Sequence, residues 1–325
     1  MASAPTANNR PARLDDAELP PRAAITGMWP GQHVEVGGVD VFVRTTPPAA
    51  ARAEPALFVH GLGGSATNWT DLAGLVRNRL AVEAIDLPGF GRSGPAPDAD
   101  YRLAAHARTV IGYLDQSRRG PVHLVGNSLG GAVSIVVASQ RPDLIKTLTL
   151  ISPAVPDIRM RAHALRGDPR MALLVLPGLG GMAMRRVASV PAETRVKATI
   201  DLCFADPSRF PRQRMAEAVS EAQARQAMSW ANVAFLRSLR GLAHSQFVAG
   251  RQAWAAMRAI TAPTLVLWGD RDRLVAPDLA PRVAVAIPDS RLRVLENIGH
   301  TAMMEDPETT ARALLALVED AVRRS

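Results

Sequence analysis

Apolar runs of strand length alternate with segments of helical periodicity over residues 34–152. The pattern predicts six strands and at least three helices, with strands at 34–36, 39–44, 56–60, 82–86, 122–126 and 145–152 and helices near 67–77, 102–116 and 129–140. The first two strands read as a hairpin across Gly37-Gly38. Alternation of this kind predicts the α/β class, with a mostly parallel, doubly wound sheet.

The pattern changes over residues 153–259, which show helical periodicity and few strand-like runs. Strand–helix alternation then resumes at Pro263. We therefore expect one core, made of residues 26–152 and 260–325, with the helical segment 153–259 inserted into it. Residues 1–25 carry four prolines, mixed charge and no apolar stretch, so they predict a flexible N-terminal tail rather than a signal peptide.

Positive charge gathers in the inserted helical segment. The chain has 38 Lys+Arg and 30 Asp+Glu, a net charge of +8, and residues 153–259 alone hold 16 basic and 7 acidic residues. Because no interleaving of basic and aromatic residues accompanies this charge, we expect no nucleic-acid partner. Charged positions on helices usually mark the solvent side, so we expect these arginines on outer helix faces.

Composition narrows the class of protein further. Hydrophobic residues make up 47% of the chain and charged residues 21%, which is ordinary for a globular domain with a sizeable core. The single cysteine, Cys203, rules out an internal disulfide, and no Cys/His cluster has zinc-ligand spacing, so no metal is expected. No apolar run reaches the roughly 18–20 residues of a transmembrane helix, and a cytoplasmic protein without a transmembrane segment is the expectation.

One motif indicates a chemistry. Residues 122–132 read Val-His-Leu-Val-Gly-Asn-Ser-Leu-Gly-Gly-Ala, so an apolar strand runs into Gly126-x-Ser128-x-Gly130 and an apolar helix follows at once. A turn this tight places the serine at positive φ, and the two glycines leave no side chains to clash there. Ser128 Oγ then stands exposed at the carboxyl end of the sheet, and the N–H of Leu129 points to where an oxyanion would form.

Polar residues that could assist a serine nucleophile follow three other predicted strands. Residues 60–63 form a His-Gly-x-Gly turn, the strand at 264–269 runs into Asp270-Arg-Asp272, and the last strand ends at His300. The chain order of serine, acid and histidine, together with these turns, resembles the α/β-hydrolase superfamily over about residues 34–322. The resemblance implies the α/β-hydrolase fold, with residues 153–259 as its helical cap, or lid.

The resemblance also implies a role for each residue. Ser128 would be the nucleophile and His300 the base, because a serine hydroxyl needs a base within hydrogen-bond reach. The N–H groups of Leu62 and Leu129 would form the oxyanion hole. The superfamily's G-x-x-D spacing, counted from Gly269, selects Asp272 as the acid that orients the histidine.

Two other carboxylates stay open as the acid. Asp270 shares the turn, where we expect it to cap the backbone, and Asp157 follows the strand at 145–152, where some superfamily members place their acid. His60 is expected to be structural and to hold the oxyanion turn. The loop at 86–93, which matches the superfamily's D-x-P-G-x-G-x-S pattern, is also expected to be structural.

The residues favour a serine hydrolase, carboxylesterase- or lipase-like, that cleaves an ester or related acyl substrate through an acyl-enzyme without a cofactor. With Asn127 directly before Ser128, the motif resembles that of the meta-cleavage product hydrolases, which break carbon–carbon bonds. Thr301 after the histidine and the Gly61-Leu-Gly-Gly-Ser65 turn depart from the pattern of that family. A non-catalytic receptor or binding protein of the same fold is disfavoured because all three triad residue types are present.

Apolar side chains of the inserted segment would suit an apolar acyl or alkyl group of a small-molecule substrate. The same side chains could instead pack the segment onto the core. They are Leu173, Leu174, Val175, Leu176, Leu179, Met182 and Met184.

Overall fold

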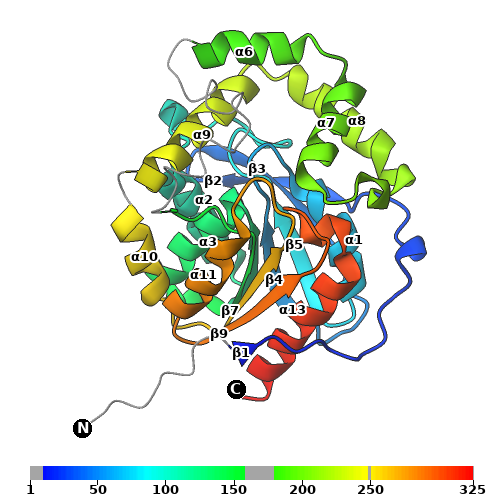
Figure 1. The fold of residues 1–325 in the computed structure, drawn as a ribbon, viewed down its shortest axis with the longest axis vertical. Coiled ribbons are helices and arrows are strands. Elements are labelled where there is room, and N and C mark those ends of the chain that lie inside the picture. Colours follow the sequence, from blue (N-terminus) through cyan, green and yellow to red (C-terminus); the bar gives the residue numbers. More distant parts are fainter. Residues whose placement is uncertain (1–9, 158–178, 248–249, 325) are drawn as a thin grey trace.

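The computed structural model describes residues 10–157, 179–247 and 250–324 (Figure 1). Within these residues a single sheet contains nine strands in the order β1-β9-β8-β7-β6-β4-β5-β3-β2. The strands are β1 (Arg10–Pro11), β2 (Gly31–Val36), β3 (Val39–Thr45), β4 (Glu54–Val59), β5 (Leu80–Ile85), β6 (Val122–Asn127), β7 (Ile145–Ile151), β8 (Thr264–Gly269) and β9 (Ser290–Leu295). The β2–β3 hairpin and the β3–β5 pair are antiparallel, and every other pairing among these strands is parallel. The predicted α/β class with a mostly parallel, doubly wound sheet is confirmed.

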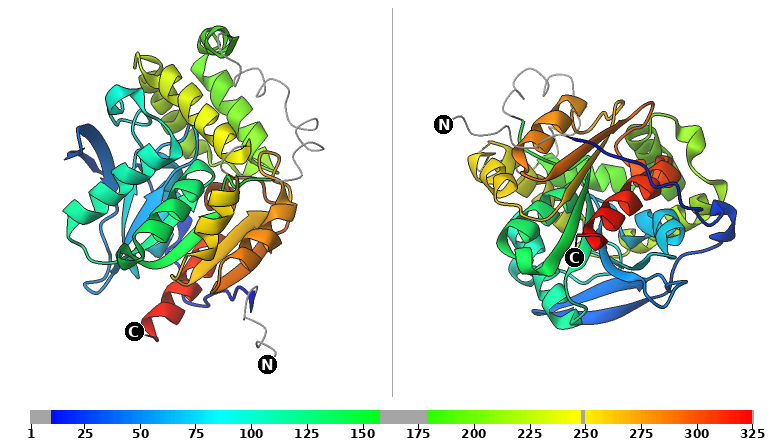
Figure 2. Two further views of the ribbon diagram at one scale, coloured as in Figure 1. Left: turned by 90° about the vertical axis from the view of Figure 1, so that its left-hand side faces the viewer. Right: turned by 90° about the horizontal axis from the view of Figure 1, so that it is seen from below.

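Helices cover both faces of the sheet (Figure 2, right). One face packs against α1 (Thr70–Val76), α12 (Ala302–Glu305) and α13 (Pro307–Val322), and the other against α2 (Leu103–Ser117), α3 (Leu129–Gln140), α10 (Gly250–Arg258) and α11 (Ala280–Ala286). Short 3₁₀ helices connect these elements at η1 (Arg22–Ala24), η2 (Ala66–Trp69), η3 (Pro97–Ala99), η4 (Pro142–Leu144), η5 (Pro207–Arg209) and η6 (Pro277–Leu279).

The central strands are mostly apolar because both of their faces are buried. In β4, Leu57 and Val59 join the core cluster on the α2–α3 side, whereas Ala56 and Phe58 join the cluster on the α1–α13 side. Side chains alternate between the two faces of a strand, so a strand covered on both sides shows a continuous apolar run. This geometry explains why the strand positions could be predicted from the sequence.

Among the described helices between β7 and β8, four stand apart from these two layers. They are α6 (Leu179–Ala188), α7 (Ala192–Cys203), α8 (Arg212–Gln226) and α9 (Ala231–Phe247). Figure 1 shows them above the end of the sheet to which β7 leads, opposite the C-terminus, so they overlie the carboxyl ends of the parallel strands. We call residues 179–247 the insertion.

Both ends of the predicted segment 153–259 pack against the core. Ala154 and Val155 belong to the core cluster on the α2–α3 side. Helix α10 packs against α3 and α11, and its Met257 is fully buried in that cluster. Periodicity reports that a helix has an apolar face, but it does not report which surface that face covers.

The N-terminal residues differ from the prediction. Residues 10–25 are not a flexible tail: Arg10 and Pro11 pair with the edge strand β9, and Ala12 N donates to Leu292 O at 3.0 Å. Ile25 is buried against α1, and Arg22 forms two hydrogen bonds with Asp71 Oδ2, at 2.9 and 3.1 Å. The unpaired backbone of an edge strand offers a partner that composition cannot reveal. Residues 1–9 lie outside the described part of the chain.

Candidate active site

Ser128 lies in the turn between β6 and α3. Its backbone has φ 53° and ψ −115°, so the expected positive φ is confirmed. Ser128 N donates to Ile151 O at 3.1 Å, and Ser128 O accepts from Ala132 N at 3.0 Å and from Ala154 N at 2.9 Å. All of these partners belong to the core, which therefore holds the strained serine without help from the insertion.

Two glycines allow this turn to form, and we call residues 126–130 the elbow. A methyl group on Gly130 would collide with the carbonyl oxygens of Val59 and His60, and one on Gly126 would collide with Gly130 O. The first turn of α3 is therefore seated against the carboxyl end of β4. The first N–H groups of a helix have no partner within the helix, so the N–H of Leu129 is available to an anion beside Ser128.

The loop after β4 lies against the elbow. A methyl group on Gly61 would lie 3.1 Å from Ser128 Cβ, and Leu62, next in the chain, is half-buried against the α2–α3 side of the core. His60 Nε2 accepts from Leu87 N at 3.0 Å, so the proton lies on Nδ1, which donates to Gly61 O at 2.7 Å. Burial lowers the pKa of His60 to about 4, so the ring is neutral at pH 7. These bonds are those of a structural histidine.

Asp272 and His300 are joined by a hydrogen bond. His300 Nδ1 lies 2.8 Å from Asp272 Oδ2, and both side chains are buried. Asp272 Oδ1 accepts from Leu274 N at 2.8 Å and from Val275 N at 2.9 Å. Because the carboxylate accepts a hydrogen bond from Nδ1–H, Nε2 is left with its lone pair and can accept a proton.

The two alternative acids have other partners. Asp270 is exposed, and its carboxylate lies 3.7 Å from Arg271 Nε. Asp157 Oδ1 lies 3.5 Å from Arg282 Nη1. The expectation that Asp270 caps the turn is wrong, because Asp272 accepts the hydrogen bonds from the N–H groups of this turn.

Asn127 ties the elbow to the histidine. Its Nδ2 donates to Ile151 O at 3.0 Å and to His300 O at 3.1 Å. Ser128 and His300 are thus held by neighbouring backbone, although among the described residues no direct hydrogen bond joins Ser128 Oγ to the imidazole. In the sequence, Asn127 indicates only a resemblance to a family, because its bonding partners are 24 and 173 residues away.

Cys203 is poorly suited to act as a nucleophile in place of Ser128. It ends α7 and packs with Phe204 and Phe210 at the base of the insertion. Burial, with Asp272 and Glu305 nearby, raises the pKa of its thiol to about 12. The reactive thiolate form is therefore scarce at neutral pH.

An arginine of the insertion reaches the loop after β4. Arg225, on α8, donates from Nη1 to Gly63 O at 2.7 Å, and its guanidinium lies over the rings of Phe90 and Phe235, 5.2 and 5.7 Å from their centroids. Burial lowers the pKa of Arg225 to about 10, so it keeps its charge at neutral pH. Arg225 remains partly exposed, whereas Arg214 is buried, in an ion pair with Asp71 at 2.7 Å. The expectation of outward-facing arginines is wrong for these two residues.

The apolar residues proposed for a substrate pocket divide into three groups. Leu173, Leu174, Val175 and Leu176 lie outside the described residues, as does the side chain of Leu179. Met182 on α6 is 54% exposed, whereas Met184 is partly buried. An exposed methionine is poorly placed to line an apolar pocket.

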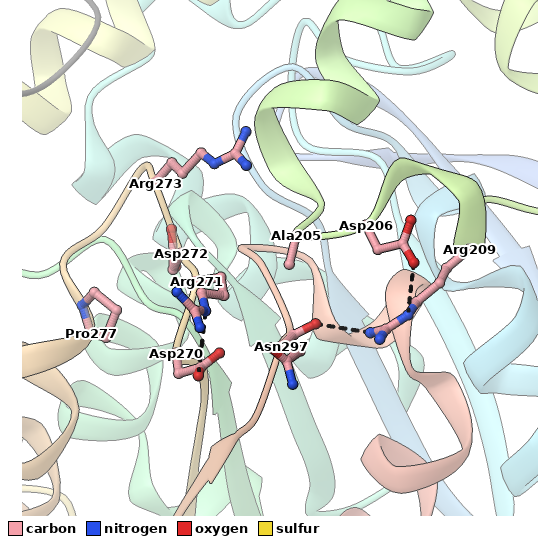
Figure 3. A pocket seen from close by; sticks show the side chains of 9 residues that line it. All are labelled: Ala205, Asp206, Arg209, Asp270, Arg271, Asp272, Arg273, Pro277 and Asn297. Carbon is pink, nitrogen blue, oxygen red and sulfur yellow. Dashed lines mark hydrogen bonds and ion pairs between the residues drawn. The ribbon is translucent and has the colours of Figure 1, made fainter.

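A cavity of about 660 Å³ lies where the insertion meets the turn after β8 (Figure 3). Charged side chains dominate its lining, which comprises Ala205, Asp206, Arg209, Asp270, Arg271, Asp272, Arg273, Pro277 and Asn297. Across residues 10–157, 179–247 and 250–324, no group of three or more His, Cys, Asp or Glu side chains could hold a metal ion. In the same part of the chain, no helix is long and apolar enough to cross a membrane.

Comparison with known proteins places these features in a family. Residues 55–307 match the family model of the alpha/beta hydrolase fold. A 2-hydroxy-6-oxononadienedioate/2-hydroxy-6-oxononatrienedioate hydrolase of Cupriavidus pinatubonensis is 27% identical over 297 residues, 90% of this chain and 96% of that protein. Lipase 1 of Psychrobacter immobilis is 27% identical over 79% of this chain and 74% of its own length. A haloalkane dehalogenase structure from Bradyrhizobium elkani, 23% identical, matches with a TM-score of 0.75 over 91% of this chain and 99% of that chain.

Proposed function

Because the chain belongs to the alpha/beta hydrolase fold family, we propose that it is a serine hydrolase that cleaves a carboxylic ester or related acyl substrate through an acyl-enzyme. The observation that carries the proposal is the 2.8 Å bond between His300 Nδ1 and Asp272 Oδ2, on a histidine whose backbone is tied by Asn127 to the strained turn of Ser128. In a catalytic triad, His300 would be the base, Asp272 the acid that orients it and Ser128 the nucleophile beside it.

In the proposed reaction, Ser128 Oγ attacks the carbonyl carbon while His300 Nε2 takes the hydroxyl proton. The N–H groups of Leu62 and Leu129 hold the oxyanion of the tetrahedral intermediate. His300 gives its proton to the leaving alcohol, and the acyl group remains on Ser128. Water then attacks the acyl-enzyme with His300 again as base, and the acid product leaves. The Ser128–His300 hydrogen bond forms as substrate binds.

Substrate preference is proposed from the side chains around the loop after β4. Leu62 and Phe235 are apolar and half-buried, and Phe235 lies close to Gly63. They would suit an apolar acyl or alkyl group, with the insertion acting as a cap over it. Arg225 lies within the same cluster and would bind a carboxylate carried by the substrate.

Arg225 also favours a second candidate, the hydrolysis of a carbon–carbon bond in an acidic substrate. The Cupriavidus relative is named for dioate substrates, which carry two carboxylates. A charged guanidinium beside the proposed oxyanion hole would orient such a substrate for attack by Ser128. This candidate uses the same triad and differs only in the bond that breaks.

A substrate panel tests the two candidates. It comprises p-nitrophenyl esters of several chain lengths, a thioester and a 2-hydroxy-6-oxo-dienoate, each measured with the wild type and with Ser128→Ala. Turnover of the esters that is lost in Ser128→Ala is expected. Turnover of the dienoate alone would replace the first candidate by the second, and turnover of nothing in the panel would overturn both.

A further inference from the structure

The side chain of Glu305 is 0% exposed, although no role was assigned to this residue from the sequence. Glu305 ends α12, five residues after His300. Its Oε2 accepts from Gly299 N at 2.7 Å, and its Oε1 accepts from Asp206 N at 2.9 Å. Ala205 N lies within hydrogen-bond distance of both oxygens, at 3.0 and 3.1 Å. One buried carboxylate therefore binds the histidine turn, which we define as residues 297–301, and the turn that follows α7 in the insertion.

Other contacts join the same two turns. His300 N donates to Cys203 O, the last residue of α7, at 2.7 Å. Arg209 Nη1 donates to Asn297 O at 2.9 Å and lies 3.6 Å from Glu305 Oε1. Figure 3 shows Arg209 and Asn297 facing each other across this junction. The backbone N–H of His300 is thus bound by the insertion, and the N–H before it by Glu305.

The carboxylate of Glu305 matches the hydrogen-bonding needs of the two turns that it joins. It accepts hydrogen bonds at both oxygens and donates none, which matches a set of N–H donors. Without it, the N–H of Gly299 and two N–H groups of the insertion would be buried without partners, and buried donors of this kind are costly. The peptide that would relax is the one directly before the proposed base. Displacement of a reacting group by about 1 Å can lower a rate by about a hundredfold.

We propose that Glu305 is a positioning residue that couples the insertion to His300. Its carboxylate holds Gly299 and the Ala205–Asp206 turn together, so the imidazole reaches Ser128 only when the insertion is seated. The inference rests on the proposed function, because it assigns His300 as the base. Glu305 itself contacts no reacting atom; it acts through the backbone of the histidine turn.

The test is Glu305→Gln, which keeps the volume of the side chain but presents an NH₂ group to N–H donors. With a p-nitrophenyl ester, kcat per active site should fall by about 10- to 100-fold while KM stays within about threefold, since the base is displaced and the binding surface is not. Titration of active sites with a fluorophosphonate gives the concentration of competent enzyme, so a loss of folded protein cannot imitate the effect. Glu308→Gln is the matched control, because Glu308 is exposed three residues along and should leave kcat unchanged.

A second variant approaches the contact from the insertion. Ala205→Pro removes the N–H that Glu305 binds with both oxygens, and Phe204 before it already has φ −98° and ψ 147°, the extended conformation that proline requires of its predecessor. It should lower kcat in the same direction while Glu305 is intact. Unchanged kcat in both folded variants would overturn the inference. A wild type that fluorophosphonate does not label would instead overturn the proposed function, so the two failures are distinct.

Discussion

The elbow and the histidine turn meet at one site but are held in different ways. Within the described residues, the elbow is held by core elements, through Ile151 O, Ala154 N and the close seating of Gly130 on β4. The histidine turn is held from both sides: Asn127 and Arg271 of the core donate to its carbonyl groups, and Cys203 O of the insertion accepts from His300 N. The strained nucleophile is therefore built in with the core fold, whereas the backbone of the proposed base is also bound by a segment added to that fold.

The largest expected effect lies on the histidine side. Asp272→Asn keeps an oxygen to accept from Leu274 N and Val275 N, so the turn should persist, but it presents an amide to His300 Nδ1. The imidazole should then adopt the wrong tautomer, and kcat should fall by on the order of 10⁴. Steady-state kinetics with a p-nitrophenyl ester measure this loss.

Asp270→Asn is the matched control for that experiment. Asp270 is exposed and paired only with the neighbouring Arg271 in the contacts described above, so the variant should keep kcat within about threefold of the wild type. A larger loss for Asp270→Asn than for Asp272→Asn would move the acid to Asp270. If both variants stay active, Asp157 becomes the candidate.

A smaller effect is expected where the insertion touches the loop after β4. Arg225 contacts that loop by a side chain, so Arg225→Gln should change substrate preference without displacing the base. For an ester bearing a carboxylate, kcat/KM should fall by about 10- to 100-fold, since charge-assisted hydrogen bonds contribute about 1.5–3 kcal/mol. For a matched neutral ester, little change is expected.

Exposed Arg237, on α9 of the insertion, provides the control for Arg225. It donates to Ala99 O, and Arg237→Gln should leave both esters unaffected. In the wild type, added salt should lower kcat/KM for the anionic ester alone. Equal losses for the two esters in Arg225→Gln would refute a carboxylate-binding role.

A different kind of effect concerns the stability of the core-built half. Burial lowers the pKa of His60 and His123 to about 4 and that of His106 to about 3. The unfolded chain protonates these rings near pH 6.5, while the folded chain resists, so the free energy of unfolding should fall as pH drops from about 6.5 to about 4. Each ring contributes about 1.4 kcal/mol per pH unit within that window. Burial raises the pKa of Asp86 to about 6, which opposes the effect by one proton.

Urea unfolding at pH 7, 6 and 5 measures this slope. His123→Gln should reduce the dependence of the free energy of unfolding on pH by about one proton, because it removes one of the three buried rings. His123 lies on β6 and bonds to Thr147, away from the site. A free energy of unfolding that stays level or rises on acidification would show that the buried histidines do not titrate as described.

The same contrast explains what could be predicted from the sequence. The elbow is determined by local sterics, so it can be predicted from the five-residue pattern that contains Gly126, Ser128 and Gly130. The sheet follows from apolar runs. Strand β2 nevertheless begins at Gly31, before the predicted start, because its first three residues are exposed and none has a large apolar side chain. Asp272 was selected by its spacing from Gly269, and its bond to His300 lies within the same edge of the sheet.

Contacts between distant segments could not be predicted. Glu305 and Ala205 are 100 residues apart, and nothing in either neighbourhood indicates the other. Arg225 is one of many arginines in its segment, and nothing in the sequence indicates that it contacts the loop after β4. The pairing of residues 10–11 with β9 was missed for the same reason, since a two-residue strand has no pattern of its own.

The most direct test of the account is to locate the covalent adduct of a fluorophosphonate. The account predicts one modified peptide in the wild type, with the phosphonyl group on Ser128. Ser128→Ala should take up no label and should lose at least about a thousandfold in kcat, because only binding and the oxyanion hole would remain to catalyse. Labelling that persists in Ser128→Ala, or an adduct on another residue of the wild type, would contradict the assignment of Ser128 as the nucleophile.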